Sequence, residues 1–220
     1  MTPSPSSSSS SSKSSSSKSS STTTTTSSSS SSLHPTLIIF DLDDCLWSPE
    51  MFQLSSLPKD PTTDSAGEVV ACSTADGDSV RLFPGARRVL SKLSSGGYNL
   101  PSSTLLAVAS SSEVPSYSQS CLDTLTVNSR PLSSLFAASA IGRTGGLTSR
   151  KTTHVERLTS QLRTQSFTVD PSSTLFFDDC NWGDHVGDLE TTLGIKGVRT
   201  PEGLTEELFE EGLARFRGGE

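Results

Sequence analysis

The chain has 220 residues, with 17 Lys or Arg against 24 Asp or Glu and a formal net charge of −7. This acidic balance, without any long basic run, argues against a nucleic-acid-binding surface. No apolar stretch is long enough to cross a membrane, so we expect neither nucleic acid nor a membrane among its partners.

A Ser/Thr-rich segment opens the chain. Residues 2–32 are almost entirely Ser and Thr, with no large apolar side chain. Such a segment cannot bury enough apolar surface to offset the entropy of ordering. We therefore expect residues 1–32 to be a disordered tail and residues 33–220 to form one domain. The segment lacks the apolar core of a secretory signal, which predicts a cytoplasmic protein. An organellar address in the hydroxyl-rich tail is the alternative.

The first apolar run ends in acidic residues. Leu37–Phe40 is unbroken and apolar, which is typical of a strand buried on both faces of a parallel sheet. Asp41 and Asp43 follow it, and ligands of open α/β sheets bind beyond the carboxyl ends of the strands. Two carboxylates at such an end repel each other, and a hard divalent cation such as Mg²⁺ would relieve this repulsion. For this stretch alone, a polar turn is the alternative.

The next segment predicts a small flap, followed by alternating helices and strands. Residues 68–72 and 79–83 are short apolar runs on either side of Asp76-Gly77, a pair typical of a β-hairpin. After this hairpin we expect a helix over residues 84–93, a buried strand over 105–109 that runs into Ser110, a helix over 117–125 and a strand over 135–141.

A lysine precedes the next predicted helix. Val155, Leu158 and Leu162 fall on one helical face, and Ser149 is the expected N-cap. Lys151 then lies at a helix N-terminus, which itself attracts anions. The alternative interpretation of Lys151 is a solvated surface lysine.

A second acidic strand end completes the pattern. Residues 174–177 form a short apolar run that ends in Asp178 and Asp179. Together with the first acidic pair, they would place four carboxylates at one sheet edge, an arrangement that needs a metal ion and a cationic side chain. The remaining apolar patterns predict a helix over residues 184–193, a strand over 195–199 and a helix over 204–216. Alternating strands and helices indicate a doubly wound, Rossmann-like parallel sheet, an α/β fold.

These motifs occur in the order found in a known superfamily. The acidic pair after the first strand, the Ser after the second, the Lys and the last acidic pair resemble the haloacid dehalogenase superfamily of phosphotransferases. Five stretches are similar in particular to its magnesium-dependent phosphatase-1 group: FDLDDCLW, LFPGARRVL, AVAS, KTTHVERL and LFFDD. The resemblance covers about residues 35–216. With the short segments available for insertions, it implies a hairpin flap and no large cap domain.

The resemblance also implies roles for the site residues. Asp41 would be the nucleophile that forms an aspartyl-phosphate, and Asp43 the general acid and base. Ser110 and Lys151 would bind the phosphate. Mg²⁺ would be held by Asp41, by Asp43 through its backbone carbonyl, and by the pair Asp178 and Asp179, with Asp179 expected as the direct ligand.

We therefore expect a Mg²⁺-dependent phosphatase that acts on a phosphorylated small molecule or a phosphorylated protein side chain, with phosphotyrosine and sugar or glycation phosphates as the substrates that the resemblance implies. Ser111 stands where the group usually has Arg, which weakens the expectation of phosphotyrosine. A non-catalytic phosphate- or phosphoprotein-binding module is the alternative. Trp47 and Trp182 adjoin the acidic loops, either packing under them or lining the entrance, whereas His154 and His185 are isolated and suggest no ligand role.

Overall fold

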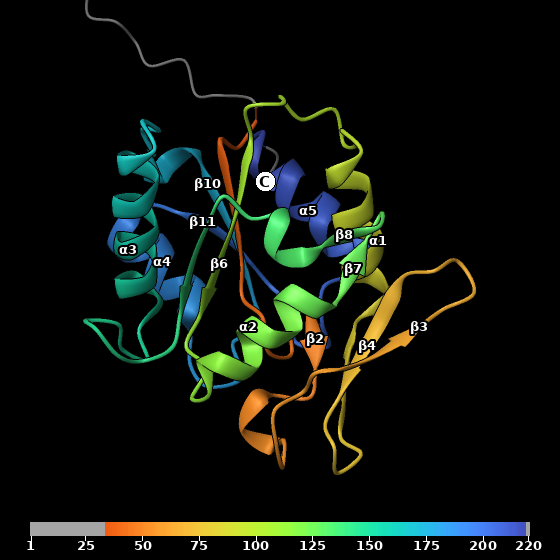
Figure 1. Ribbon diagram of the computed structural model, residues 1–220. Helices are drawn as coiled ribbons and strands as arrows, with labels where there is room; N and C mark the ends of the chain where they lie inside the picture. The colour runs from red at the N-terminus through yellow and green to blue at the C-terminus, as the bar shows by residue number, and fades with distance from the viewer. Residues whose placement is uncertain (1–33, 219–220) are drawn as a thin grey trace, which may run out of the picture. The chain divides into compact units, whose positions relative to one another are not determined.

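The computed structural model describes residues 34–218, so the expected tail lies outside the described residues. A five-stranded parallel sheet runs through the domain (Figure 1). Its order is β11-β10-β1-β6-β9, with bounds Lys196–Arg199, Thr174–Asp178, Leu37–Phe40, Leu105–Ser110 and Ala138–Ile141. The doubly wound fold is confirmed.

The strand order reverses at β1. The chain goes from β1 through β6 to β9 on one side, and then returns to place β10 and β11 on the other. Phe40 pairs with Phe177 of β10 and Val108 of β6, so the acids that follow β1 emerge between two neighbouring strand ends. In open α/β sheets, this switch point is where ligands bind.

Helices cover both faces of the sheet because the β1 side chains alternate between two buried clusters. Ile38 and Phe40 join one cluster, and Leu37 and Ile39 join the other. Helices α1 (Pro84–Ser94), α2 (Pro115–Thr124) and α5 (Glu206–Phe216) contribute to the first cluster; α3 (Lys151–Thr164) and α4 (His185–Leu193) contribute to the second (Figure 1).

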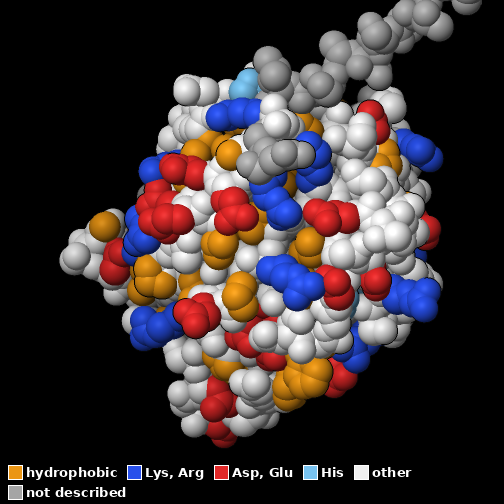
Figure 2. All heavy atoms as spheres, turned by 180° about the vertical axis from the view of Figure 1, so that it is seen from behind, with side chains coloured by type: hydrophobic (Ala, Val, Ile, Leu, Met, Phe, Trp, Pro, Cys, Tyr) orange, Lys and Arg blue, Asp and Glu red, His pale blue; other side chains and the backbone are white. Residues whose placement is uncertain are grey.

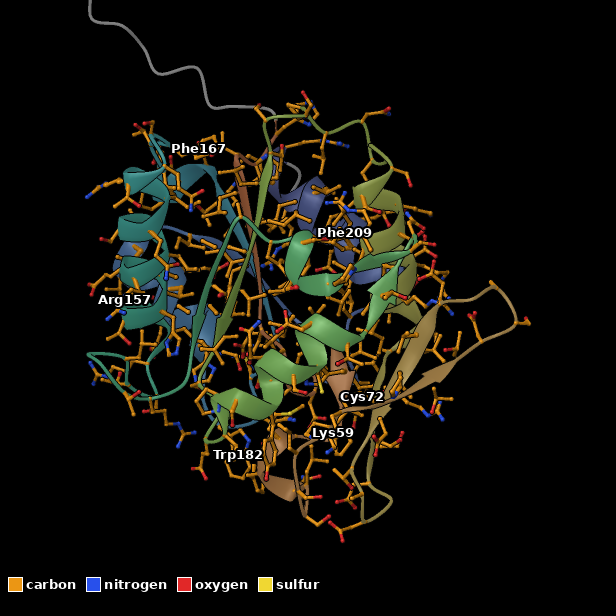
Figure 3. All side chains as sticks on the ribbon, viewed as in Figure 1. Lys59, Cys72, Arg157, Phe167, Trp182 and Phe209 are labelled. Carbon is orange, nitrogen blue, oxygen red and sulfur yellow. The ribbon has the colours of Figure 1, made fainter. Side chains whose placement is uncertain are left out.

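Aromatic rings fill the centre of the first cluster. The ring of Phe177 stacks on those of Phe40 and Phe209, with centroids 5.4 Å apart in each pair. Phe209 is the inward residue of α5 that meets the strands (Figure 3). This packing holds the ends of β1 and β10, and therefore the acids that follow them, in a fixed relation.

The helices and strands expected from the sequence are present, with ends shifted by a few residues. One detail of the prediction is wrong: α3 begins at Lys151, its N-cap is Arg150 and no side chain caps it, so Ser149 is not the cap. Gly194 does end α4, in the left-handed conformation (φ 71°) that a residue without Cβ adopts readily.

The flap is larger than the predicted hairpin. Strands β4 (Val69–Ser73) and β5 (Ser79–Leu82) form that hairpin, and β2 (Trp47–Ser48) and β3 (Asp60–Thr63) extend it to a four-stranded antiparallel sheet. Strand β3 reads Asp-Pro-Thr-Thr and is exposed along its whole length, so it lacks the apolar alternation by which a strand is predicted. Proline suits this edge position.

The remaining insertions are short. Between β1 and β6, the flap is accompanied by α1 and by a 3₁₀ turn, η1 (Met51–Gln53). Between β6 and β9 lie α2, the short strands β7 (Thr126–Val127) and β8 (Arg130–Pro131), and η2 (Leu132–Ser134); η3 (Pro171–Ser173) precedes β10. Residues 34–218 thus contain no large cap domain.

Within residues 34–218, no helix has the length and apolar character needed to span a membrane. On the face shown in Figure 2, acidic and basic side chains are interspersed with apolar ones, and neither sign forms a broad patch.

Candidate active site

Three of the predicted acids meet at the end of β1 and β10. Carboxylate oxygens of Asp41, Asp178 and Asp179 all lie within 4.8 Å of one another. Their residues are 7%, 0% and 8% exposed, so the three charges are concentrated where water screens them poorly. Asp41 follows β1 directly, Asp178 is the last residue of β10 and Asp179 follows it.

Lys151 reaches this acidic cluster from the first position of α3. Its ammonium nitrogen lies 2.6 Å from Asp41 Oδ2 and 3.0 Å from Asp178 Oδ2, and it donates a hydrogen bond to the carbonyl of Ala109 at 2.9 Å. Two carboxylate oxygens and one carbonyl oxygen thus surround the ammonium within 3.0 Å. Lys151 is 2% exposed, and its interpretation as a solvated surface lysine is wrong.

The pKa values in the cluster reflect burial and these ion pairs. Burial would lower the pKa of Lys151, but the neighbouring charges of Asp178 and Asp41 raise it above its usual value. Burial favours the protonated form of Asp178, and Lys151 and His185 more than offset that effect, so its pKa is lowered. For Asp41, burial raises the pKa in spite of Lys151, with the charge of Asp178 adding to the effect.

The carboxylate of Asp43 is held separately from the cluster. The indole N–H of Trp47 donates to Asp43 Oδ1 at 2.8 Å, and the backbone N–H of Met51 donates to Asp43 Oδ2 at 3.2 Å. Burial raises the pKa of Asp43 to about 6, against these two hydrogen bonds. A carboxyl group that exchanges a proton near neutral pH is suited to general acid–base chemistry.

These residues open onto one cavity. Asp41, Asp43, Ser110 and Asp179 line a space of about 380 Å³, and Ser110 ends β6 at its inner wall. Lys151 does not line this cavity, since its ammonium is engaged by the acids and the Ala109 carbonyl. The structure therefore brings all six predicted site residues together; Asp41, Asp43, Ser110 and Asp179 line the cavity, whereas Lys151 and Asp178 do not.

Several cavity residues were not predicted from the sequence. They are Glu50, Phe52, Glu113, Arg143 and His185. His185 Nδ1 lies 3.0 Å from Asp178 Oδ1, so this histidine contacts the acidic cluster, a position that the sequence did not indicate. Its position at the start of α4, beside the last acidic loop, was the only available signal.

The two tryptophans have different roles. Trp47 is fully buried and orients Asp43 through its indole N–H. Trp182 is 72% exposed and lines the cavity entrance. Of the two interpretations that the sequence left open, packing holds for Trp47 and the entrance for Trp182.

Comparisons with known proteins agree with this architecture. A protein-family profile described as Acid Phosphatase matches residues 33–218. The chain belongs to this family, which places it among the haloacid dehalogenase-like phosphatases, as expected from its motifs. No curated protein sequence matches the chain significantly.

Two solved proteins were found by structural comparison. A haloacid dehalogenase-like family hydrolase from Streptococcus pneumoniae is 15% identical, with 84% of this chain and 99% of that one covered and a TM-score of 0.47. CbbY from Rhodobacter sphaeroides, solved with phosphate, is 13% identical, with 75% and 85% covered and a TM-score of 0.45. A further CbbY structure, a mutant in complex with xylulose-1,5-bisphosphate, is 12% identical, with the same coverage and TM-score.

Proposed function

We propose that this chain is a Mg²⁺-dependent phosphatase that hydrolyses phosphate monoesters through an aspartyl-phosphate on Asp41. The observation that supports it most strongly is the convergence of Asp41, Asp178, Asp179 and Lys151 beside Asp43 at the end of β1. This set supplies a nucleophile and a separate proton donor that line one cavity, and a charge-compensating lysine that is buried against the nucleophile.

The acidic cluster fits a divalent metal ion. Three carboxylates with close oxygen atoms face a single ammonium, so one cationic side chain leaves excess negative charge among the buried acids. Asp178 Oδ2 also lacks a hydrogen bond, although Lys151 lies nearby. Oxygen ligands of this kind suit Mg²⁺. We infer that Asp41, Asp179 and the Asp43 carbonyl would hold it, with Asp178 fixed by Lys151 and His185; the ion would neutralise charge and orient the phosphate.

The protein's own groups account for the two chemical steps. In the first, the Asp41 carboxylate attacks phosphorus, and the ester oxygen leaves with a proton from Asp43. In the second, water attacks the same phosphorus and gives a proton to Asp43, so phosphate leaves and Asp41 is regenerated. Splitting one displacement into two in this way is the advantage of a covalent intermediate.

Lys151 and Ser110 support these steps from different positions. The Lys151 ammonium stabilises the ionised form of Asp41, which is the form that attacks, and lowers the repulsion that an incoming phosphate dianion meets. Ser110, which ends β6 and lines the cavity, would donate its hydroxyl to a phosphoryl oxygen. Phosphoryl transfer depends mainly on such positioning and charge stabilisation.

The cavity opens to solvent beside a small flap, so we propose that a phosphorylated small molecule or a phosphorylated side chain on a protein can enter it. Phosphotyrosine and sugar or glycation phosphates belong to this proposal. Cytoplasmic localisation stays a prediction.

Phosphate release from a panel of monoesters with Mg²⁺ tests the proposed function. Asp41→Asn should abolish release, whereas Asp44→Asn should retain it, because Asp44 lies in the same loop outside the acidic cluster and its φ of 53° is tolerated by Asn. Absence of release from every ester by the wild type, or full activity of Asp41→Asn, would contradict the proposal.

A further inference from the structure

Trp182 is exposed at the cavity entrance without a packing reason. At 72% it is more exposed than the other exposed large apolar residues of the described chain, Phe52, Leu57 and Phe167. Figure 3 shows Trp182 at the lower end of the domain, near the segment that contains η1 and far from Phe167. A large indole surface beside the proposed catalytic cavity is available for contact with a ligand.

The indole ring is nevertheless held in a defined orientation. Its N–H lies 3.0 and 3.1 Å from the two carboxylate oxygens of Glu50, to which it donates. The ring of Phe52 lies at a centroid distance of 6.3 Å and an interplanar angle of 71°. Two rings at a steep angle, with a carboxylate beside them, form a corner with negative π faces and a negative charge. Alkylammonium groups bind to surfaces of this kind.

The charges around the entrance favour a cation at this corner. Arg143 is neutralised by Glu113 at 2.8 Å, and its Nε donates to the carbonyl of Ser111. Glu50, in contrast, forms no salt bridge with any Lys, Arg or His of the described chain. Glu50, which contacts Trp182, is therefore a carboxylate at the entrance without a salt-bridge partner in the described chain, and the charge of Arg143 acts on it only from beyond salt-bridge distance.

We propose that Glu50, Phe52 and Trp182 form a subsite for a cationic leaving group, so that the preferred substrates are phosphate monoesters of alkylammonium alcohols. This inference rests on the proposed phosphatase function and narrows its substrate class. The phosphate would occupy the inner cavity beside Asp41, and the ammonium would lie against the Trp182 and Phe52 rings near Glu50.

Two isosteric esters test the subsite. Choline phosphate and 3,3-dimethylbutyl phosphate have the same shape, but only the first carries a quaternary ammonium. With Mg²⁺, kcat/KM should be roughly 3- to 30-fold higher for choline phosphate, the range expected from a cation–π contact between an exposed and a desolvated setting. Equal values, or a preference for the neutral ester, would overturn the subsite.

Substitutions test whether Trp182 and Glu50 cause the preference for choline phosphate. Trp182→Leu and Glu50→Gln should each lower the ratio of the two kcat/KM values toward one, while Phe167→Leu, an exposed aromatic residue far from the cavity, should leave the ratio unchanged. An unchanged ratio in both subsite variants would contradict the assignment. If the wild type releases phosphate from no ester of the monoester panel, the proposed phosphatase function itself fails. Turnover of other monoesters without a preference for choline phosphate overturns the subsite alone.

Discussion

The ammonium of Lys151 lies 2.6 Å from the carboxylate of Asp41, and both groups are almost completely buried. The lysine comes from the start of α3 and the aspartate from the end of β1, so the pair forms only when the two elements dock. The ammonium favours the ionised form of Asp41 and so opposes burial, which raises the pKa of this carboxyl group. We therefore expect the stability of the fold and the proposed reactivity of Asp41 to depend on the same contact.

Removing the lysine charge should destabilise the protein. Lys151→Met leaves Asp41 and Asp178 buried without their cation, and breaking a buried ion pair in this way destabilises by about 3–5 kcal/mol. The free energy of unfolding, measured with urea in the absence of divalent ions, checks this value. Lys59→Met, at an exposed position of the flap, is the control and should change little. A loss in Lys151→Met no larger than in Lys59→Met would contradict the described pairing.

Magnesium should stabilise the folded protein through the acidic cluster. At about a hundred times its Kd, an ion that binds only the folded state adds about 2.7 kcal/mol, which corresponds to roughly 5–10 °C in Tm for a domain of this size. Thermal unfolding with and without Mg²⁺ measures the shift. Asp179→Asn should remove most of it, while Glu113→Gln, a cavity carboxylate outside the cluster, should retain it. An undiminished shift in Asp179→Asn would count against the metal site.

The fall in kcat caused by removing the proposed proton donor, Asp43, should depend on the leaving group of the substrate. Asp43→Asn should lower kcat by about 10²–10⁴-fold for an alkyl phosphate, the usual range for general acid–base catalysis. The loss should be smaller for p-nitrophenyl phosphate, whose leaving oxygen needs little protonation. Single-turnover rates with the two esters give the comparison. Equal losses for both would show that Asp43 does not protonate the leaving group.

A chain that starts at Leu33 should keep the activity and Tm of the full chain, because the acid phosphatase family match begins there and the site is formed by residues 41–185. Phosphate release and thermal unfolding of the two chains check this prediction. A clear loss of either in the shorter chain would show that residues 1–32 contribute to the folded domain.

Much of the site could be predicted from the sequence because its polar residues lie at the ends of apolar strands. The apolar runs before Asp41 and Asp178 fix two adjacent buried strands, and parallel strands bring their carboxyl ends to one edge. The order of the motifs then identified Ser110 and Lys151. The helices covering the sheet followed from apolar periodicity, as at Leu158 and Leu162.

The features that the sequence did not predict are positioned by tertiary contacts. Strand β3 has no apolar alternation and is defined only by pairing with β4. Glu50 and Trp182 are 132 positions apart and meet only because the loops after β1 and β10 converge. His185 joins Asp178 because α4 starts beside the same sheet edge. No local pattern in the chain encodes these distances.

Detection of the covalent intermediate tests the central claim most directly. The enzyme is mixed with Mg²⁺ and a ³²P-labelled monoester that it hydrolyses, quenched in acid within one turnover, and digested for peptide mass spectrometry. We predict acid-stable, hydroxylamine-sensitive phosphate on the peptide that contains Asp41, and none in Asp41→Asn. Release of phosphate by the wild type without labelling of Asp41, or with label on another residue, would contradict the account.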